Sequence, residues 1–331
     1  MTAPRRYIAL EEHCMTPGLQ RVHDDLLAEH GRFQPAANVE RLLDVDAARI
    51  EAMDAAGIDV QVLSHHSPGA QISDPRAVEW ARTANDELAA AIARHPSRFA
   101  GFATLATGDA DAAASELIRC VEQLGFTGTM IHGQAGGGFL DHPRNEPVLR
   151  AASQLGVPIY VHPAEPPEAV KDAYFRDVHE AGPDAERMEH MFATAGWGWH
   201  VETGSHALRM ILGGVFDRHP NLQVILGHWG ELIPFYLGRV DIRMKRLVRH
   251  LRKSPAQYFA EHFHVTPGGI ETIQPLLLTL ATVGADRVLY SADYPFGAAE
   301  TAGRAYIEDA PISEADKSKI AHLNAEKLLR I

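Results

Sequence analysis

Short apolar runs rich in β-branched residues alternate along the chain with amphipathic stretches of helical period. Runs of this length predict buried strands, and the amphipathic stretches predict helices that cover them. The expected strands are residues 7–13, 58–64, 99–105, 128–132, 157–162, 222–228, 258–265 and 288–293. The expected helices include residues 39–56, 75–95, 109–124, 203–218, 233–251, 268–283 and 313–329. Glycines that end helices precede several strands: Gly57, Gly125, Gly156 and Gly284.

This alternation of buried strands and helices predicts a single α/β domain, a (β/α)8 TIM barrel over residues 1–331. A doubly wound open sheet is the alternative. Its glycine-rich phosphate loop would follow the first strand, where Glu11, Glu12 and His13 stand instead. Residues 163–200, after the fifth strand, are too long for an ordinary connection, so we expect a long loop that covers the substrate.

Acidic and histidine residues end four of the predicted strands. Glu11 and His13 end the first strand, His162 the fifth, His228 the sixth and Asp293 the eighth. In a (β/α)8 barrel the carboxyl ends of all strands open onto one face, which carries the chemistry. These side chains are therefore expected to converge on one mouth, as the ligands of a metal ion do.

The first strand supplies half of the expected metal site. Residues two apart on a strand face the same way, so Glu11 and His13 should share a face with Tyr7 and Ala9. A carboxylate and an imidazole side by side favour a divalent cation. The alternative is that Glu11 pairs with a buried cationic side chain.

The later strand ends have alternatives of their own. His162 could be a capping hydrogen-bonding residue after its strand, and Asp293 could cap a following helix. Because Glu11 and His13 already supply half of a metal site, we interpret His162 as a further ligand and Asp293 as a ligand that also moves a proton. Glu231 follows His228 closely, and a carboxylate bonded to one ring nitrogen keeps the other available. The two predict a proton-handling pair, with a fifth ligand role for His228 as the alternative.

The number of metal ions is predicted from two absences. Hydrolytic barrels with two metals usually carry His-x-His on strand 1 and a bridging lysine on strand 4. Here strand 1 carries Glu11-x-His13, and strand 4 ends at His132 without a lysine. We therefore expect one divalent ion per subunit and no organic cofactor.

The overall composition excludes several classes of protein. An apolar fraction of 46% and a charged fraction of 22% are ordinary for a globular protein. The net charge of -12 argues against nucleic acid or an anionic membrane as partner. Cys14 and Cys120 are the two cysteines, which fits a reducing cytoplasm. No leader-like segment opens the chain and no run of roughly 18 apolar residues occurs, so neither secretion nor membrane spanning is expected.

Four segments carry a family resemblance: residues 10–13 (LEEH), 160–163 (YVHP), 225–231 (ILGHWGE) and 291–296 (SADYPF). As a set they resemble the signatures of metal-dependent non-oxidative decarboxylases of the amidohydrolase superfamily, in the branch with aminocarboxymuconate semialdehyde decarboxylase. The γ-resorcylate and 2,3-dihydroxybenzoate decarboxylases are the members that the segments resemble most. The likeness spans nearly the whole chain.

The resemblance implies a barrel of the amidohydrolase type that removes carbon dioxide from an ortho-hydroxy aromatic acid, reversibly. It implies that a manganese, zinc or magnesium ion binds to Glu11, His13, His162 and Asp293. It also implies that His228 and Glu231 lie beside a substrate of the dihydroxybenzoate or salicylate type. Either Asp293 or His228 would give the proton to the ring carbon. Family members are typically homodimers or homotetramers, and Arg239 would shape the site or the interface.

The expected pocket contains residues in addition to the ligands. His132 stands where close relatives tend to carry asparagine, and the segment after His162 contains Trp197. Flat aromatic side chains can sandwich a ring substrate. We predict substrate contacts from His132, Trp197, Arg239 and Phe296.

Two other functions remain open at this point. A mononuclear metal hydrolase acting on a lactone or amide would use the same residues, with Asp293 as the base. Release of carbon dioxide rather than a new acid from a matched substrate pair separates the two reactions. A structural metal protein is the non-enzymatic alternative, and such sites are closed by protein ligands.

Overall fold

The computed structural model describes residues 5–29, 36–134, 137–178, 182–297 and 304–331. Its strands form one parallel sheet in the order β7-β6-β5-β4-β3-β2-β1-β8. A parallel bridge between Val265 of β7 and Val288, just before β8, joins the two edges of the sheet, and the Leu289 amide donates to the Val265 carbonyl at 2.9 Å. The sheet is therefore closed, as the predicted (β/α)8 barrel requires.

The strands are short. They are β1 (Ile8–Cys14), β2 (Val60–His65), β3 (Phe99–Ala103), β4 (Gly128–His132), β5 (Ile159–His162), β6 (Val224–Leu226), β7 (Phe263–Val265) and β8 (Tyr290–Ser291). Helix C-terminal glycines precede three of them as predicted, because Gly57, Gly125 and Gly156 adopt the left-handed conformation that a side chain would strain.

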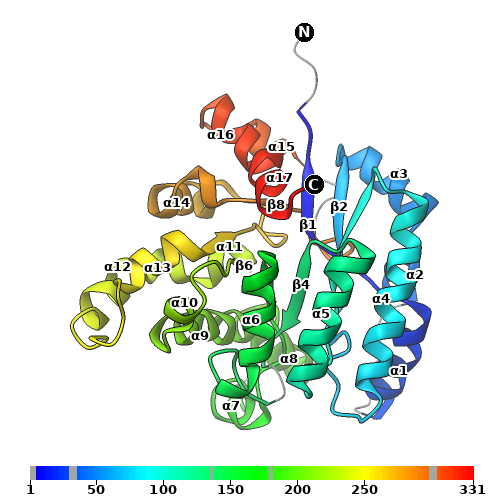
Figure 1. Ribbon diagram of the computed structural model, residues 1–331, viewed down its shortest axis with the longest axis horizontal. Coiled ribbons are helices and arrows are strands. Elements are labelled where there is room, and N and C mark those ends of the chain that lie inside the picture. The colour runs from blue at the N-terminus through cyan, green and yellow to red at the C-terminus, as the bar shows by residue number, and fades with distance from the viewer. Residues whose placement is uncertain (1–4, 30–35, 135–136, 179–181, 298–303) are drawn as a thin grey trace.

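Helices surround the strands (Figure 1). In the first half they are α1 (Pro17–Glu29), α2 (Ala36–Leu43), α3 (Ala47–Ala56), α4 (Ala77–Arg94), α5 (Ala110–Leu124), α6 (Glu146–Leu155), α7 (Glu168–Tyr174) and α8 (Ala185–Ala193). They continue as α9 (Gly198–Leu212), α10 (Val215–Arg218), α11 (His228–Glu231), α12 (Ile233–Met244), α13 (Pro255–His262), α14 (Ile273–Val283), α15 (Ala305–Glu308), α16 (Glu314–Ser318) and α17 (Asn324–Leu329). In Figure 1, α17 lies toward the top of the barrel and α7 and α8 lie at the bottom.

Apolar side chains form one core inside the barrel and another around it. The inner cluster consists of Ile8, Leu10, Val60, Val62, Phe102, Met130, Tyr160, Ile225, Leu289, Ala325 and Leu329. The outer cluster, between strands and helices, includes Tyr7, Ala9, Leu63, Ile159, Val161, Val224 and Leu226. Alternate strand residues thus belong to different cores, which is the two-residue period of a strand buried on both faces.

A bulge in β1 interrupts this alternation at the predicted metal site. Ala9 pairs with Gln61 but Glu12 pairs with Leu63, so β1 contains one residue more than β2 between these pairs. Glu11 takes up the extra residue with a positive φ of 61°. The prediction that Glu11 and His13 share a face with Tyr7 and Ala9 is therefore wrong. Tyr7 and Ala9 pack in the outer core, and the bulge turns the two later side chains inward.

Buried polar bonds hold the bulge in place from outside the barrel. The Glu12 carboxylate accepts from the Ala292 amide at 2.8 Å and from the Gln61 side chain at 2.6 Å. The Arg49 guanidinium donates to the His13 carbonyl at 2.5 Å and to the Gln61 side chain at 3.3 Å. Burial raises the pKa of Glu12 to about 8, although the Ala292 amide and Arg49 act against this shift. The network fixes β1 to β2 and to the end of β8.

Several other predicted elements differ from the structure. The predicted helix at residues 39–56 is two helices, α2 and α3, and His228 and Asp293 lie two residues beyond the ends of β6 and β8. Residues 258–262, predicted as strand, are the end of helix α13, and only β7 is extended. Residues 163–200, predicted as an irregular loop, contain helices α7 and α8 and the first turn of α9. Among the helices in the described part of the chain, none is long and apolar enough to cross a membrane.

We predict that Arg49→Met lowers the free energy of unfolding by about 3–5 kcal/mol, because it removes one charge from a buried polar network. The carbonyls of His13 and Asp44 lose a donor, and the stacking of Arg49 over the Tyr294 ring is lost. Urea unfolding of the metal-free protein measures the change. Arg94→Met is the control, since Arg94 makes an exposed ion pair and its loss should cost less than about 1 kcal/mol. An equal effect of both variants would contradict the assigned role of Arg49.

Candidate active site

Three of the predicted ligands meet at the mouth of the barrel. Glu11, His13 and His162 each place one ligand atom within 4.8 Å of the other two. Asp293 lies next to them, with Oδ1 at 3.3 Å from Nε2 of His13. The side chains come from β1, from β5 and from the segment after β8, so the barrel brings together residues that are far apart in sequence, as predicted.

The Glu11 carboxylate is fully buried and only half satisfied. Its Oε2 accepts from the Tyr160 hydroxyl at 2.5 Å and from the Thr266 hydroxyl at 3.2 Å. Its Oε1 has no hydrogen-bond partner and lies 3.5 Å from Nε2 of His162. Burial raises the pKa of Glu11. A buried carboxylate with a free oxygen is stabilised by a cation or by a proton.

His162 has a ring orientation that suits a ligand. Its Nδ1 donates to the Pro163 carbonyl at 2.7 Å and lies 3.2 Å from Nδ1 of His132, which leaves Nε2 turned toward Glu11. Burial and the neighbouring His13 and His132 rings hold the pKa of His162 well below its usual value. The ring is therefore neutral, and neutral imidazole is the form that binds metals.

His13 and Asp293 are positioned by their backbones. The His13 amide donates to the Tyr294 carbonyl at 2.8 Å, and the His13 carbonyl accepts from Arg49, so both backbone groups are bonded. Asp293 has a positive φ of 57°. Gly269 lies against it: a Cβ at Gly269 would come within 2.9 Å of Oδ2 of Asp293. A side chain at position 269 would therefore crowd the aspartate, and the φ of 73° at this position also favours glycine.

A divalent cation fits this donor set. The nitrogen–oxygen distances of 3.3 and 3.5 Å across the cluster exceed those of charge-assisted hydrogen bonds, although the atoms face each other. Such spacing is expected of groups that surround a shared ion. Glu11 Oε1 and His13 Nδ1 are buried and have no partner. Two imidazoles with one or two carboxylates are common ligands of manganese and zinc.

His228 and Glu231 form a pair beside the cluster. Nδ1 of His228 donates to Oε1 of Glu231 at 2.8 Å, and Nε2 lies 3.9 Å from Oε1 of Glu11. Burial alone would lower the pKa of His228, but the Glu231 and Glu11 carboxylates outweigh it and raise that pKa to about 10. Burial would raise the pKa of Glu231, but His228 and His200 outweigh it and lower that pKa.

An unusual backbone turn carries this pair. Residues 228–232 all have positive φ angles, between 48° and 79°. α11 is therefore a left-handed turn, and each non-glycine residue in it costs about 1–3 kcal/mol. Hydrogen bonds hold the turn: the Trp229 amide donates to the Thr266 carbonyl at 2.8 Å, and its indole donates to the Ile270 carbonyl at 2.7 Å. A strained backbone that is held by the surrounding structure is typical of functional sites, so this turn indicates a functional role for His228 and Glu231.

A cavity of about 940 Å³ lies between the mouth and helices α7 and α8. Its wall near the ligands contains His66, Ala164, Trp199 and Phe296. The Phe296 ring is tilted against two histidine rings, with its centroid 5.0 Å from that of His66 and 5.8 Å from that of His13. The rest of the wall carries charged side chains such as Lys171, Arg176 and Glu189, so only the end of the cavity near the mouth is aromatic and suits a small flat molecule.

The remaining predicted residues have different positions. His132 is buried behind His162 and donates to the His65 carbonyl at 3.1 Å, so it supports a ligand. Trp197 is half exposed and is not part of the wall of this cavity, where Trp199 stands instead. Arg239 lies exposed on α12. Phe296 lines the cavity, and its contact with a substrate stays a prediction.

Three residues of the site were not predicted. Tyr160 stands two positions before His162 on an inward-facing strand position, a spacing that could have indicated it. Thr266 directly follows β7. His200 bonds to Glu231 across 31 residues of sequence, and no local pattern indicates that contact.

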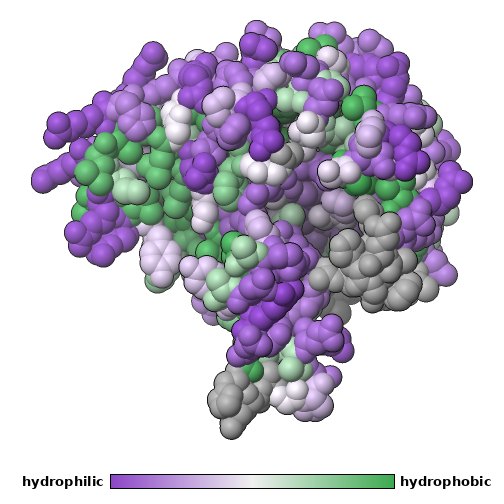
Figure 2. Space-filling view, turned by 90° about the horizontal axis from the view of Figure 1, so that it is seen from below, coloured by the Kyte–Doolittle hydropathy of each residue, from purple (hydrophilic) through white to green (hydrophobic). Residues whose placement is uncertain are grey.

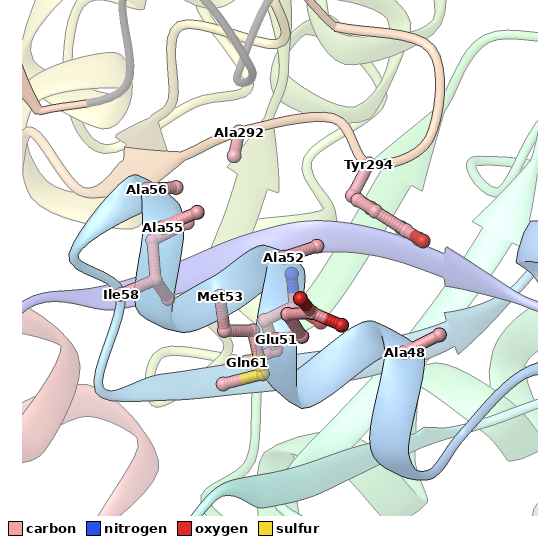
Figure 3. A pocket seen from close by; sticks show the side chains of 10 residues that line it. All are labelled: Ala48, Glu51, Ala52, Met53, Ala55, Ala56, Ile58, Gln61, Ala292 and Tyr294. Carbon is pink, nitrogen blue, oxygen red and sulfur yellow. The ribbon is translucent and has the colours of Figure 1, made fainter.

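A second cavity, of about 320 Å³, lies outside the barrel (Figure 3). Alanines and Met53 of α3 form much of its wall, together with Gln61, Ala292 and Tyr294. Ala292 and Tyr294 flank Asp293 in sequence, so this cavity lies behind the segment that carries the aspartate. Among its lining residues only Glu51 can ionise at neutral pH, which makes it unsuitable for acid–base or metal chemistry.

Comparisons with known proteins agree with this geometry. The γ-resorcylate decarboxylase of Rhizobium radiobacter is 37% identical over 98% of both chains. A solved 2,6-dihydroxybenzoate decarboxylase, in complex with 2,6-dihydroxybenzoate, is 36% identical, with a TM-score of 0.85 over 99% of this chain and 100% of that one. A dihydroxybenzoic acid decarboxylase from Polaromonas sp. JS666, solved with manganese and 2-nitroresorcinol, is 34% identical, with a TM-score of 0.85 over 99% of this chain and 97% of that one.

A profile of the amidohydrolase family matches residues 28–331, which is most of the chain. With relatives above 30% identity over nearly the full length, the resemblance seen in the sequence is confirmed. The chain belongs to the amidohydrolase family.

Proposed function

We propose that this protein is a metal-dependent, non-oxidative decarboxylase of ortho-hydroxybenzoic acids. One observation carries the proposal: the Glu11, His13 and His162 cluster faces the same small space as Nε2 of His228, whose other nitrogen is held by Glu231. The site thus offers a place for a cation beside a group that can give a proton. The relatives named for γ-resorcylate and dihydroxybenzoate decarboxylation support this reaction class.

We assign one divalent ion per subunit to Glu11, His13, His162 and Asp293. When bound, the ion supplies the positive charge that orients the carboxylate and the neighbouring hydroxyl of the substrate. Tyr160 and Thr266 hold Oε2 of Glu11, which leaves Oε1 directed at the ion site. The manganese in the Polaromonas relative makes manganese the first ion to test.

The protein side chains handle the proton in this reaction. The carbon that bears the carboxylate gains a proton, the carbon–carbon bond breaks, its electrons return to the ring, and carbon dioxide leaves. His228 can provide this proton from Nε2, because Glu231 holds Nδ1–H and keeps Nε2 toward the mouth. Asp293 is the alternative donor: its side chain lies at the edge of the cluster and is partly exposed, and it would deliver to the ring carbon a proton that it first takes from the substrate hydroxyl. Run in reverse with bicarbonate, the site would carboxylate a phenol.

We also propose that the protein is a homodimer or homotetramer. Helix α12 exposes Phe235 and Ile242, which are 68% and 66% accessible, and Arg239 lies between them on the same face. Figure 2 shows hydrophobic atoms gathered on the left, where Figure 1 places α12. Large apolar side chains exposed together on one helix are typical of a subunit interface.

The reaction is tested with manganese-loaded protein and a panel of 2,6-dihydroxybenzoate, 2,3-dihydroxybenzoate and salicylate. We expect chelator-sensitive release of carbon dioxide and formation of the matching phenol from one or more of them. Asp293→Asn should lower kcat by roughly 10²- to 10⁴-fold, as loss of a proton-handling group does, while ring binding remains measurable. If matched lactones or amides are hydrolysed and the acids are untouched, the protein is a hydrolase and the proposal fails.

The ion assignment is tested with Tyr160→Phe. Loss of the hydroxyl that holds Oε2 of Glu11 should weaken manganese binding by about 10- to 100-fold, as loss of a second-layer partner does. Isothermal titration against a competing chelator measures the affinity. Tyr258→Phe is the matched control, because Tyr258 also bonds to a carboxylate, that of Asp217, outside the site. Equal manganese affinity in wild type and Tyr160→Phe would place the ion elsewhere.

The interface is tested with Phe235→Asp combined with Ile242→Asp. The two charges should reduce the mass measured by light scattering to that of one chain, because burying unpaired carboxylates opposes association. Val78→Asp, on an exposed position of α4 that is 40% accessible, should leave the mass unchanged. A wild-type protein that elutes as a monomer at micromolar concentration would refute the oligomer.

A further inference from the structure

We propose that His200 is a positioning residue for the reaction. It would hold the Glu231 carboxylate in the orientation and ionised state that keep His228 in its working tautomer. The proposal rests on the proposed role of the His228 and Glu231 pair. The proposal adds His200, from the start of α9 in the segment that covers the mouth, to the residues of the site. Neither the names of the relatives nor the metal cluster indicates this residue.

The contact geometry forms a chain of two short hydrogen bonds. Nδ1 of His200 lies 2.8 Å from Oε2 of Glu231, and Nδ1 of His228 lies 2.8 Å from Oε1 of the same carboxylate. The Glu231 side chain is fully buried, and the His200 and His228 rings lie 4.4 Å apart at their centroids. Each carboxylate oxygen thus has its own imidazole donor, and a buried carboxylate with both oxygens bonded favours the anion.

The helix that carries His200 is fixed against the turn that carries Glu231. Gly204 stands four residues after His200, so both lie on one face of α9. A Cβ at Gly204 would come within 2.6 Å of the Glu231 carbonyl oxygen, so only glycine permits this approach. The close packing brings the first turn of α9 over Glu231 and directs His200 at its free oxygen.

Nε2 of His200 lies 3.0 Å from the Trp199 indole nitrogen, which can only donate, and 3.0 Å from the Ala195 carbonyl oxygen, which can only accept. Nδ1 faces the Glu231 carboxylate, which accepts hydrogen bonds, so Nδ1 is the donor of that bond. Trp199 lines the substrate cavity and lies 6.3 Å from the His162 ring. His200 therefore connects the cavity wall to the acid–base pair through Glu231.

The role follows from what His228 needs. A carboxylate that accepts from Nδ1 keeps the opposite nitrogen available to the reacting group, as in the serine protease triad. Without a donor on Oε2, Glu231 is free to rotate or to take up a proton, because burial favours its neutral form. Glu231 would then hold His228 less often in the required tautomer. His200 prevents this without touching the substrate.

The experiment compares His200→Leu with His200→Asn in the metal-loaded enzyme. Leucine removes the donor, and kcat should fall by about 10- to 100-fold, the usual loss for an outer-layer partner, with KM little changed. Asparagine can place an amide nitrogen where Nδ1 was, and it should restore most of the rate. His322→Leu is the matched control, since His322 also bonds a glutamate through Nδ1, to Glu326 at 3.1 Å, away from the mouth. Its kcat should stay at the wild-type value.

A double-mutant cycle with Glu231→Gln tests the path of the effect. If His200 acts through Glu231, His200→Leu has no further effect on kcat once Glu231 is glutamine. An equal loss in both backgrounds would overturn the proposal, and so would a wild-type kcat in His200→Leu. A loss shared by the leucine and asparagine variants, in step with their melting temperatures, would show a purely structural residue and also overturn it.

Histidine NMR provides a readout that does not need activity. In ¹⁵N-histidine-labelled protein, the resonance lost in His228→Asn identifies His228. In wild type it should show a proton on Nδ1 in a strong hydrogen bond, and in His200→Leu that signal should weaken or exchange faster. An unchanged His228 signal would overturn the proposal. A wild-type enzyme without decarboxylase activity would refute the proposed function separately, because the NMR result does not depend on turnover.

Discussion

The bulge at Glu11 is the constraint on which the rest of the site depends. A regular β1 would place Glu11 and His13 on the outer face, with Tyr7 and Ala9, in the apolar outer core. One extra residue with positive φ turns both toward the mouth. The conformation costs about 1–3 kcal/mol. Glu11 keeps this strained backbone conformation only because the chain on both sides of it is firmly held.

The structure provides that support from outside the barrel. Arg49, Gln61 and Glu12 tie the bulged strand to β2 and to the end of β8, the segment that carries Asp293. The same network therefore sets the distance between His13 and Asp293, although none of its side chains faces the mouth. The left-handed turn at residues 228–232 is held in a similar way by bonds to Thr266 and Ile270. Both strained elements carry side chains of the site, and both are fixed by groups with no part in the chemistry.

Sequence patterns predicted the barrel and the strand ends because both follow from local periodicity. They failed where a local rule has an exception. The run at residues 258–265 is apolar enough for a strand, yet Ser254, Pro255 and Gln257 form a helix start with a capping box that outweighs it. The inward turn of Glu11 could not be predicted, because no glycine marks the bulge. Trp199 rather than Trp197 lines the cavity because α9 begins at Gly198, a boundary that tertiary packing decides.

The two buried glutamates at the mouth show how the protein divides their roles. Glu231 has a donor on each oxygen, and its pKa is lowered despite burial. Its negative charge is therefore stabilised by groups of the protein itself. Glu11 has donors on one oxygen only, and burial raises its pKa, so its charge needs a partner that the polypeptide does not supply. Carboxylates with opposite shifts in one pocket indicate different tasks. In the proposed function, the carboxylate with a free oxygen, Glu11, binds the cation, and the carboxylate with both oxygens bonded, Glu231, keeps His228 ready to move a proton beside it.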